Sequence, residues 1–399
     1  MLDASGNLQP LYHPRLEMAA INRRRFLALI SAAALAPMAW RTRAEADSKF
    51  DFARLRSQID DKVAAYMEAN KVPGVAIGIA TRDGGRPLQQ EYFHYGISSK
   101  ATSAPMDESS IVLINSITKV FTSSLLSIGI LRGLVRASDP IQTYLTDATV
   151  PTLEGKAITL EHLATHRSGL PRDIPNQTSD KTGDGLVKYL STYTLTRAPG
   201  AEYEYSNFGF ALLGLVMSLV IGTSFDDLVA REITGPLGMT DTQVQPSTEQ
   251  RPRLAQNYTL EGQPFPLRPV SFFAPAGDLL STTPDLMKFL IANMDPTSSP
   301  LGPALEPGLK SYAKVNNNRS SGLGWEIDFP GTANESLWKN GGDRGATSQL
   351  WFNRNLNYGL VVLTNRGLQV QSGLPVPNTS AGDAIGLELR RILTTAARA

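Results

Sequence analysis

Short strand-like segments at both ends of the chain enclose a long middle part with helical patterns. Near the N-terminus, apolar residues at helical spacing over about 51–70 predict a helix. An apolar, β-branched run follows at 75–81, and a second strand is expected at about 91–97. Strand-like runs return at 323–329, 337–339, 348–352 and 358–363, and a closing helix is expected from about 381 to 396. We therefore predict an α+β fold: an antiparallel sheet built from both chain ends with flanking helices, plus an inserted, mostly helical lobe.

These two lobes have approximate boundaries in the sequence. The sheet lobe is expected at about 47–106 and 320–399, and the helical lobe at about 107–319. Residues 47–399 then form one domain, which is long enough to bury a large core. A cleft between two such lobes is a common place for a ligand site.

Residues 1–46 have the pattern of an export signal. A basic R-R-R-F-L sequence at 23–27 precedes the apolar stretch 28–40, and the small-x-small sequence at 44–46 offers a cleavage site. The order R-R-x-F-L resembles a twin-arginine signal. The apolar stretch is interrupted by Pro37 and is too short to cross about 30 Å of hydrocarbon. We therefore expect export to the periplasm and no stable membrane span.

Charge and cysteine content exclude several classes of function. The 399 residues carry a formal net charge of +1, so there is no electrostatic reason to expect a nucleic acid or an anionic membrane as a partner. The chain has no cysteine, which excludes disulfides, a thiol nucleophile and a cysteine metal site. Nothing in the sequence indicates the oligomeric state.

The sequence Ser116-Ile117-Thr118-Lys119 is an S-x-x-K motif at the start of a predicted helix, because an apolar run follows at 120–131. The first backbone N–H groups of a helix are unpaired, so an oxyanion formed beside Ser116 can be stabilised. Lys119 lies three residues later on the same face. A serine hydroxyl becomes a nucleophile when a neighbour accepts its proton, and a partly buried lysine can do so. Because one such motif is expected by chance, the prediction depends on further elements.

The second element is Tyr205-Ser206-Asn207, a Y-x-N triplet between the turn at 197–200 and the apolar segment 208–221. This position places a phenol and an amide together beside a rigid element. Ammonium groups near a phenol lower its pKa, so we expect Tyr205 to be usable as a base. The alternative interpretation is a capping asparagine beside a half-buried tyrosine.

The third element is Lys339-Asn340-Gly341-Gly342, in a predicted short strand before a glycine-rich bend. A lysine on a strand can bind a substrate carboxylate or a phenolate. Glycine beside it lets a substrate backbone approach closely and pair along the strand edge.

Two further matches are interpreted as coincidences. Ser311-Tyr312-Ala313-Lys314 repeats S-x-x-K, but no helix follows it and we interpret it as solvated surface. Lys181-Thr182-Gly183 is a K-T-G sequence in a polar loop upstream of Tyr205, with no predicted strand around it.

The order S-x-x-K, Y-x-N, K-x-G resembles the penicillin-recognising serine hydrolases, that is, the serine β-lactamase and penicillin-binding protein family. Within that family the chain is most similar to class C β-lactamases and the related D-alanyl-D-alanine carboxypeptidases. The resemblance covers most of the mature chain and includes several segments between the motifs: 139–141, 158–171, 235–239 and 275–282.

The resemblance implies a role for each position. Ser116 is the nucleophile, and Lys119 and Tyr205 form the proton-transfer pair. Asn207 positions Lys119 and the substrate amide, while Lys339 binds the substrate carboxylate and tunes Tyr205.

The oxyanion hole implied by the resemblance consists of the backbone N–H groups of Ser116 and Gly342. Asn340 departs from the family pattern, because β-lactamases usually carry threonine at that position. Arg344, or Asn365-Arg366, is a candidate to compensate in carboxylate recognition.

Two other kinds of active site are disfavoured. His162 and His166 are four residues apart, but Leu163 replaces the glutamate of H-E-x-x-H and no aspartate cluster adjoins them, so we expect neither a metal nor another cofactor. No G-x-S-x-G sequence is present, which disfavours an α/β-hydrolase.

The predicted reaction is hydrolysis through an acyl-enzyme on Ser116. The predicted substrates are small β-lactams or peptidoglycan peptides that end in D-Ala-D-Ala. Two alternatives remain: a carboxylesterase of the same fold, against which Lys339 argues, and a penicillin-binding sensor that is acylated but does not turn over.

Overall fold

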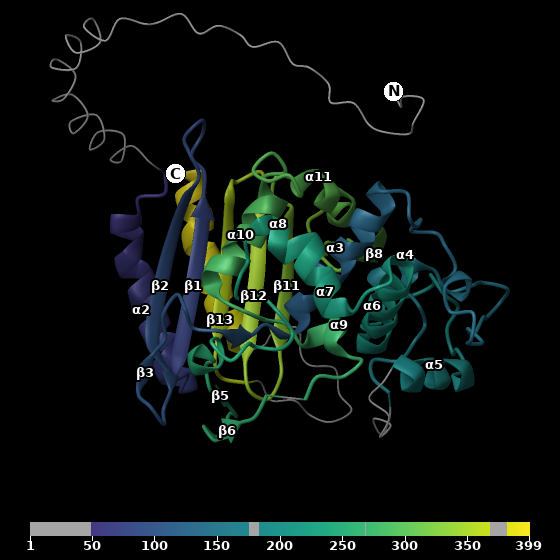
Figure 1. Cartoon of the computed structure of the whole chain (residues 1–399). Helices are drawn as coiled ribbons and strands as arrows, with labels where there is room; N and C mark the ends of the chain where they lie inside the picture. The colour runs from purple at the N-terminus through teal and green to yellow at the C-terminus, as the bar shows by residue number, and fades with distance from the viewer. Residues whose placement is uncertain (1–48, 175–182, 268, 368–380) are drawn as a thin grey trace, which may run out of the picture. The chain divides into compact units, whose positions relative to one another are not determined.

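A single antiparallel sheet combines strands from both ends of the chain (Figure 1). The computed structural model describes residues 49–174, 183–267, 269–367 and 381–399, so the predicted leader and the Lys181-Thr182 pair lie outside the described residues. The strand order within these residues is β3-β2-β1-β13-β12-β11-β10-β9-β8. The strands span, in sheet order, Ala104–Pro105, Gln89–Ser99, Gly74–Thr81, Tyr358–Thr364, Thr347–Asn353, Ser336–Gly342, Glu326–Asp328, Arg319–Ser321 and Ala313–Asn316.

The two ends of the chain meet at the pairing of β1 with β13. Val75 lies opposite Thr364 and Thr81 opposite Tyr358, with an unbroken antiparallel register between them. Both strands are buried along their whole length, which is why each reads as a continuous apolar run and not as an alternating one. This sheet and its helices confirm the predicted α+β fold.

Alternate residues of the central strands supply two separate cores. In β1, Val75 and Ile77 belong to the cluster on one face of the sheet, while Ala76 and Ala80 belong to the cluster on the other. The period of two in side-chain direction produces this division.

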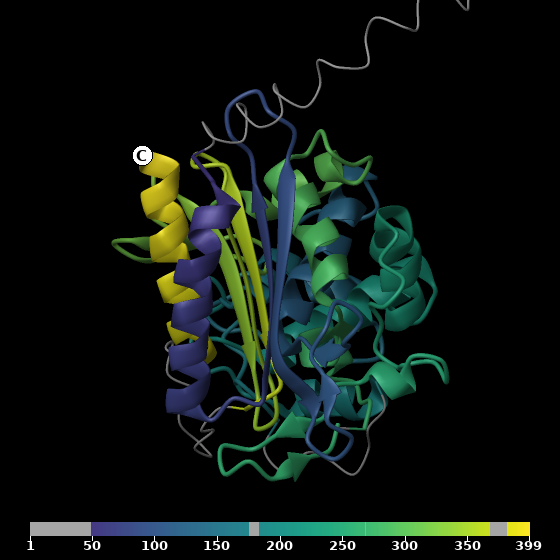
Figure 2. The same ribbon diagram turned by 90° about the vertical axis from the view of Figure 1, so that its left-hand side faces the viewer.

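The outer face is covered by the first and last helices, α2 (Phe52–Asn70) and α12 (Ala381–Arg398), which lie side by side in Figure 2. The Asp51 side chain accepts hydrogen bonds from the first backbone N–H groups of α2, and a left-handed Lys71 ends the helix. Both helices were expected from their apolar periodicity.

The inner face is covered by the helical lobe. Its α-helices are α3 (Thr118–Leu131), α4 (Leu160–Ala164), α5 (Gly183–Thr192), α6 (Asn207–Ile221), α7 (Phe225–Val229), α8 (Gly235–Leu237), α9 (Ala274–Gly277), α10 (Thr283–Met294) and α11 (Gly302–Leu305). Shorter turns of helix are η1 (Asn115–Ile117), η2 (Ile141–Thr143), η3 (Ala230–Thr234), η4 (Arg251–Arg253) and η5 (Glu306–Leu309). Two small ladders complete it: β4 (Val112–Leu113) with β7 (Leu280–Ser281), and β5 (Asn257–Tyr258) with β6 (Pro264–Phe265).

The C-terminal part of the sheet lobe begins earlier in the sequence than expected, because β8 starts at Ala313 and not near residue 320. Lys314, part of the second S-x-x-K sequence, is exposed on this edge strand. Its surface position agrees with the prediction, although it lies in a strand and not in a loop.

Within the described part of the chain, no single helix has the length and apolar composition needed to cross a membrane. One bent pair, Asn207–Ile221 with Phe225–Leu237, passes by length and composition only, and its two segments meet at 76°. Most residues of α6 are buried inside the protein.

Candidate functional site

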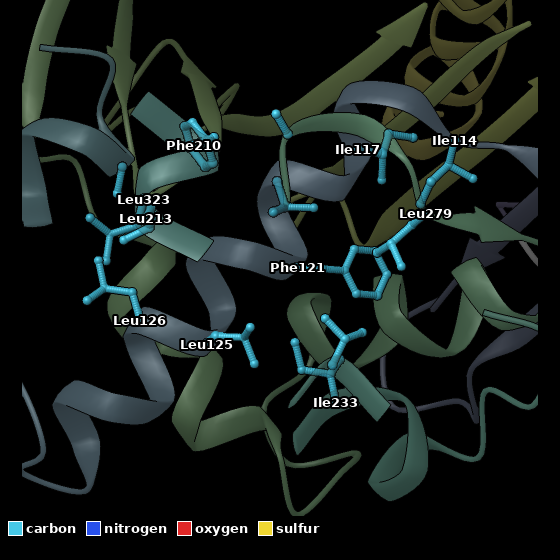
Figure 3. Packing of buried hydrophobic residues seen from close by; sticks show 14 of the residues in the cluster. Ile114, Ile117, Phe121, Leu125, Leu126, Phe210, Leu213, Ile233, Leu279 and Leu323 are labelled. Carbon is cyan, nitrogen blue, oxygen red and sulfur yellow. The ribbon is translucent and has the colours of Figure 1, made fainter. Parts of the chain in front are cut away.

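Ser116 lies in the short η1 turn that leads directly into α3. Its neighbours Ile114 and Ile117 are fully buried in the core that Figure 3 shows, so the chain is anchored on both sides of the serine. Asn115 has a left-handed backbone, and its side chain donates a hydrogen bond to the Ala346 carbonyl at 3.2 Å. The hydroxyl is therefore held partly exposed in an otherwise buried and rigid segment.

Lys119 follows one helical turn later and is completely buried. Its Nζ lies 3.0 Å from Ser116 Oγ and 2.5 Å from the carbonyl oxygen of Ala276 in α9. The carbonyl of α9 fixes the amine beside the serine. The two residues of the S-x-x-K motif are thus in direct contact.

Tyr205 reaches the same hydroxyl from the loop before α6. Its Oη donates to Ser116 Oγ at 2.6 Å, although 89 positions separate the two residues in the sequence. The Lys119 and Lys339 Nζ atoms lie 4.8 and 5.2 Å from the centre of its ring, and the Arg172 guanidinium carbon lies 4.9 Å away. The sequence-distant phenol therefore joins the serine and both lysines.

The expected lowering of the Tyr205 pKa is wrong. Burial raises the pKa of the phenol well above its ordinary value, and the hydrogen bond with Ser116 and the charge of Arg172 only partly oppose this. Desolvation of a phenolate outweighs its attraction to the neighbouring cations. The phenol therefore carries its proton at neutral pH.

Lys339 projects from β11 toward this cluster and is almost fully buried. Its Nζ lies 3.5 Å from Oε1 of Glu326 on the neighbouring strand β10, and the same oxygen accepts a 2.8 Å hydrogen bond from Tyr203. Burial lowers the pKa of Lys339, while the Glu326 carboxylate opposes the shift. We call Ser116, Lys119, Tyr205 and Lys339 the Ser116 cluster.

Gly341 explains how β11 comes so close to the serine. A Cβ at this position would overlap the Ile114 carbonyl and lie 2.9 Å from the Asn115 Cβ. The Ser348 hydroxyl, on the next strand, donates to the same carbonyl at 2.6 Å. Only glycine lets the strand pack against the backbone before Ser116. Gly342 is the following residue and ends the strand.

Asn207 is the first residue of α6, and its Nδ2 donates to the Asp173 carboxylate at 2.7 Å. Its backbone N–H donates to the Arg172 carbonyl at 2.8 Å. The Y-x-N triplet is thereby tied to the segment 172–173, which also supplies the guanidinium beside the Tyr205 ring.

Asn340 is not brought to the serine by its side chain. Its Oδ1 accepts a 3.3 Å hydrogen bond from Gln349, directly opposite on β12, and the Gln349 side chain packs against Gly386 of α12. Asn340 also lines a groove of about 720 Å³ beside α12. Alternation along β11 therefore points Lys339 toward the cluster and Asn340 toward the outer helix.

The three residues proposed to compensate for Asn340 in carboxylate binding, Arg344, Asn365 and Arg366, have contacts or exposure of a different kind from the residues of the Ser116 cluster. Asn365 is fully buried and donates to the carbonyls of Ile97 and Ser98, while Arg366 donates to the Leu260 carbonyl. Arg344 is exposed. The guanidinium of Arg172, a residue that the sequence did not indicate, lies over the Tyr205 ring.

The two histidines of the 162–166 segment have separate partners. His162 Nδ1 accepts from the Thr159 N–H at the start of α4, whereas His166 Nδ1 accepts from the Ser206 N–H. Across the described ranges, His, Asp and Glu side chains form no cluster of three that could hold a metal ion.

His166, Tyr203 and Glu326, like Arg172, were not assigned a role from the sequence. Arg172, Tyr203 and Glu326 lie outside every motif, and the spacing of His166 was compared only with that of a metal ligand. Each of the four contacts the cluster only through the tertiary fold. The Ser116 hydroxyl is in hydrogen-bonding contact with an amine and a phenol, and a second amine lies beside the phenol ring. On an α+β fold, this arrangement defines a serine hydrolase.

Comparison with known proteins agrees with this class. The family described as Beta-lactamase matches residues 59–374. A β-lactamase of Lysobacter lactamgenus is 26% identical over 373 residues, which cover 83% of this chain and 92% of that protein. The D-alanyl-D-alanine-carboxypeptidase/endopeptidase AmpH of Escherichia coli K12 is 34% identical over 209 residues, which cover 51% of this chain and 54% of that protein.

Among solved structures, a β-lactamase/D-alanine carboxypeptidase from Pseudomonas syringae superposes with a TM-score of 0.74 at 22% identity. The superposition covers 86% of this chain and 99% of that one. Since the family match spans most of the sequence, the chain belongs to the β-lactamase family, and the resemblance stated from the sequence is confirmed.

Proposed function

We propose that this serine hydrolase cleaves β-lactams or D-Ala-D-Ala peptides through an acyl-enzyme on Ser116. The observation that carries the proposal is the position of Ser116 Oγ, 2.6 Å from the Tyr205 phenol and 3.0 Å from the Lys119 amine. A serine attacks a carbonyl only when a neighbour accepts its proton, and these are hydrogen-bond distances suited to that transfer.

Lys119 in its uncharged form is the proposed acceptor of the Ser116 proton. The amines of Lys119 and Lys339 both lie close to the buried Tyr205 ring. Because like charges repel strongly where water is excluded, the state in which both lysines are protonated is disfavoured. Oγ then bonds to the carbonyl carbon, and the carbonyl oxygen becomes an oxyanion. The proposed hole for this oxyanion is formed by the backbone N–H groups of Ser116 and Gly342.

Tyr205 is the proposed donor to the leaving nitrogen, because burial keeps its proton in place. When the C–N bond breaks, the phenol protonates the nitrogen and Lys119 returns a proton to the phenolate. A water molecule then attacks the acyl carbonyl, gives its proton to the same pair, and Ser116 Oγ leaves as a hydroxyl. Lys119 and Tyr205 thus act in turn, and no proton is gained or lost over the cycle.

The substrate class follows from the charges around the cluster and from the relatives. The names of the two relatives specify a β-lactamase and a D-alanyl-D-alanine carboxypeptidase, and both substrate types carry a carboxylate close to the scissile amide. Lys339 is the proposed partner of that carboxylate, with Arg172 as a second cation. Asn207 is proposed to receive the substrate amide and to position Lys119, while Asn340 contributes only its backbone.

The test is a side-by-side assay of three substrates: a chromogenic cephalosporin, a D-Ala-D-Ala peptide and a short-chain nitrophenyl ester. Turnover of either of the first two, together with a mass increase of one acyl group on incubation with a penicillin, is expected. Ser116→Ala should abolish both turnover and labelling, and unchanged turnover would refute the nucleophile. Hydrolysis of the ester alone would instead establish an esterase, and stable labelling without product would establish a sensor.

We also propose that residues 1–46 direct export to the periplasm by the twin-arginine route. The support is the R-R-x-F-L order followed by an apolar stretch and a small-x-small site. In a fusion to a reporter protein, replacing Arg23 and Arg24 together by lysine should abolish export, while Arg41→Lys should not. Export that survives the double replacement contradicts this route.

A further inference from the structure

His166 binds the backbone on both sides of Tyr205. Its carbonyl oxygen accepts the N–H of Glu204 at 2.7 Å, and its ring Nδ1 accepts the N–H of Ser206 at 3.0 Å. The residues immediately before and after Tyr205 therefore each donate a backbone hydrogen bond to one residue, His166. His166 and the loop that carries Tyr205 lie about 40 positions apart in the sequence.

The imidazole ring also packs against the phenol ring. The two centroids are 4.4 Å apart with planes inclined at 31°, and the ring of Phe210 lies 4.8 Å from the imidazole. Only 2% of His166 is exposed. Contact with a ring that is itself packed against the core limits how far Tyr205 can move.

The hydrogen bond from Ser206 fixes the state of the imidazole. Because Nδ1 accepts this bond, the proton of the neutral ring sits on Nε2. Burial, together with the charges of Lys339 and Lys119, lowers the pKa of His166 well below its ordinary value. A protonated ring would lose the Ser206 bond and place a further cation beside Lys339, so the neutral form is the one that holds the loop.

The backbone of His166 is left-handed, with φ of 57°. This conformation turns the chain after α4 so that the carbonyl and the side chain of one residue both face the Tyr205 loop. Asparagine and glycine adopt this region readily, whereas most other side chains do not.

We propose that His166 is a positioning residue that holds the Tyr205 phenol at hydrogen-bonding distance from Ser116. This inference rests on the proposed function, since it assumes that the phenol transfers a proton there. The carbonyl and the ring Nδ1 of His166 bind the Tyr205 loop and not Ser116, so His166 acts through Tyr205. Its loss should slow the chemical step more than it weakens substrate binding.

Two variants that both tolerate the left-handed backbone at position 166 separate the effect of losing the Ser206 hydrogen bond from the effect of backbone strain. In His166→Asn, the side-chain oxygen lies close to the position of Nδ1 and can accept the Ser206 N–H. In His166→Gly, the left-handed backbone is unstrained but the acceptor is gone. We expect kcat of the glycine variant to fall by roughly tenfold or more with KM little changed, because a misplacement of about 1 Å costs about 10²-fold. The asparagine variant should retain most of the wild-type kcat.

A double-mutant cycle with Tyr205→Phe tests whether His166 acts through the phenol. Once the phenol oxygen is removed, His166→Gly should reduce the residual kcat by little more, so the two effects should not add. Full additivity, or equal losses in the glycine and asparagine variants, would show that His166 only supports the fold. His162→Asn, which removes the histidine one turn earlier, is the control and should leave kcat unchanged.

The outcome is separable from that of the proposed function. If Tyr205→Phe is inactive while His166→Gly keeps wild-type kcat, the positioning role is overturned and the reaction scheme stands. If Tyr205→Phe itself keeps wild-type kcat, the scheme falls and the positioning role falls with it. Thermal unfolding of each variant identifies any that fail to fold. If the glycine variant is one of them, the asparagine variant decides: a kcat near that of the wild type supports the positioning role, and a large loss of kcat in the folded variant overturns it.

Discussion

Glu326 and Lys339 form a buried ion pair, with 3.5 Å between Oε1 and Nζ, on adjacent strands beside the Tyr205 ring. The pair has an asymmetric setting, because Tyr203 also donates to the carboxylate whereas the amine faces the cluster. Burial favours an uncharged amine, and the carboxylate opposes this. Glu326 thus maintains a cation where the proposed substrate carboxylate binds.

Glu326→Gln should move the loss of the Lys339 charge to lower pH. The neutral amide removes the interaction that raises the amine pKa, while the burial that lowers it remains. For a substrate with a carboxylate, kcat/KM should therefore begin to fall at a lower pH than in the wild type, and a neutral ester should show no such shift. The measurement is a pair of pH profiles on the two substrates.

Asp328→Asn is the matched control for this experiment. Asp328 lies on the same strand but bonds to Arg319 at 2.7 Å, so its loss should leave the basic limb of the profile in place. A Glu326→Gln profile that coincides with that of the wild type would mean that Lys339 does not bind the carboxylate as an ammonium.

Tyr205→Phe should reduce kcat by about 10²–10⁴-fold, the usual contribution of a positioned proton donor or base. Because burial raises the pKa of the phenol above its ordinary value, the wild-type rate should not climb toward alkaline pH with a phenol titration. Stopped-flow measurement of acylation across the pH range checks both points. Tyr144→Phe is the control, because the hydroxyl that it removes donates to Asp139 and does not belong to the Ser116 cluster. A rate that rises with phenol ionisation would make Tyr205 a phenolate base.

The sequence predicted those parts of the molecule whose signal is local. The runs that became β1 and β13 are apolar because both of their faces are buried, and the S-x-x-K contact lies within one helical turn. The convergence of Tyr205 and Lys339 on the serine was inferred from motif order alone. The fold explains it through β11, which Gly341 allows to approach the Ser116 segment.

What the sequence did not reveal depends on burial and on side-chain direction. Nearby cations suggested a lowered phenol pKa, but the extent of desolvation is a property of the folded site. Asn340 adjoins Lys339 in sequence, yet strand alternation sends the two side chains to opposite faces. Glu326 contacts the cluster from a segment with no motif, and His166 was considered only as a metal ligand, so neither contact was identified.

Gly341→Ala should damage both stability and activity. The added methyl group would collide with the Ile114 carbonyl and the Asn115 Cβ, and these atoms are held by the core beside Ser116. Overpacking of this kind costs about 1–3 kcal/mol in the free energy of unfolding, and it would displace the serine from Tyr205. Urea unfolding and penicillin labelling measure the two effects. Gly85→Ala, at a turn with open space around the position, should change neither. Normal labelling of Gly341→Ala would show that the close approach is not needed.

Asn340→Ala should leave catalysis almost intact, even though Asn340 adjoins Lys339 in the motif. Its side chain lies on the α12 face, where it accepts from Gln349 beside Gly386, so its removal affects packing under the outer helix. The loss of this partly buried hydrogen bond predicts a decrease of about 0.5–1.5 kcal/mol in the free energy of unfolding. Asn207→Ala, which removes the amide at the start of α6 beside Asp173, should by contrast reduce kcat/KM substantially. Parallel kinetics and urea unfolding of the two alanine variants check this contrast. If Asn340→Ala lost activity to the same extent as Asn207→Ala, the Asn340 side chain would have to face the substrate. Its assigned position on the α12 face of the sheet would then be wrong.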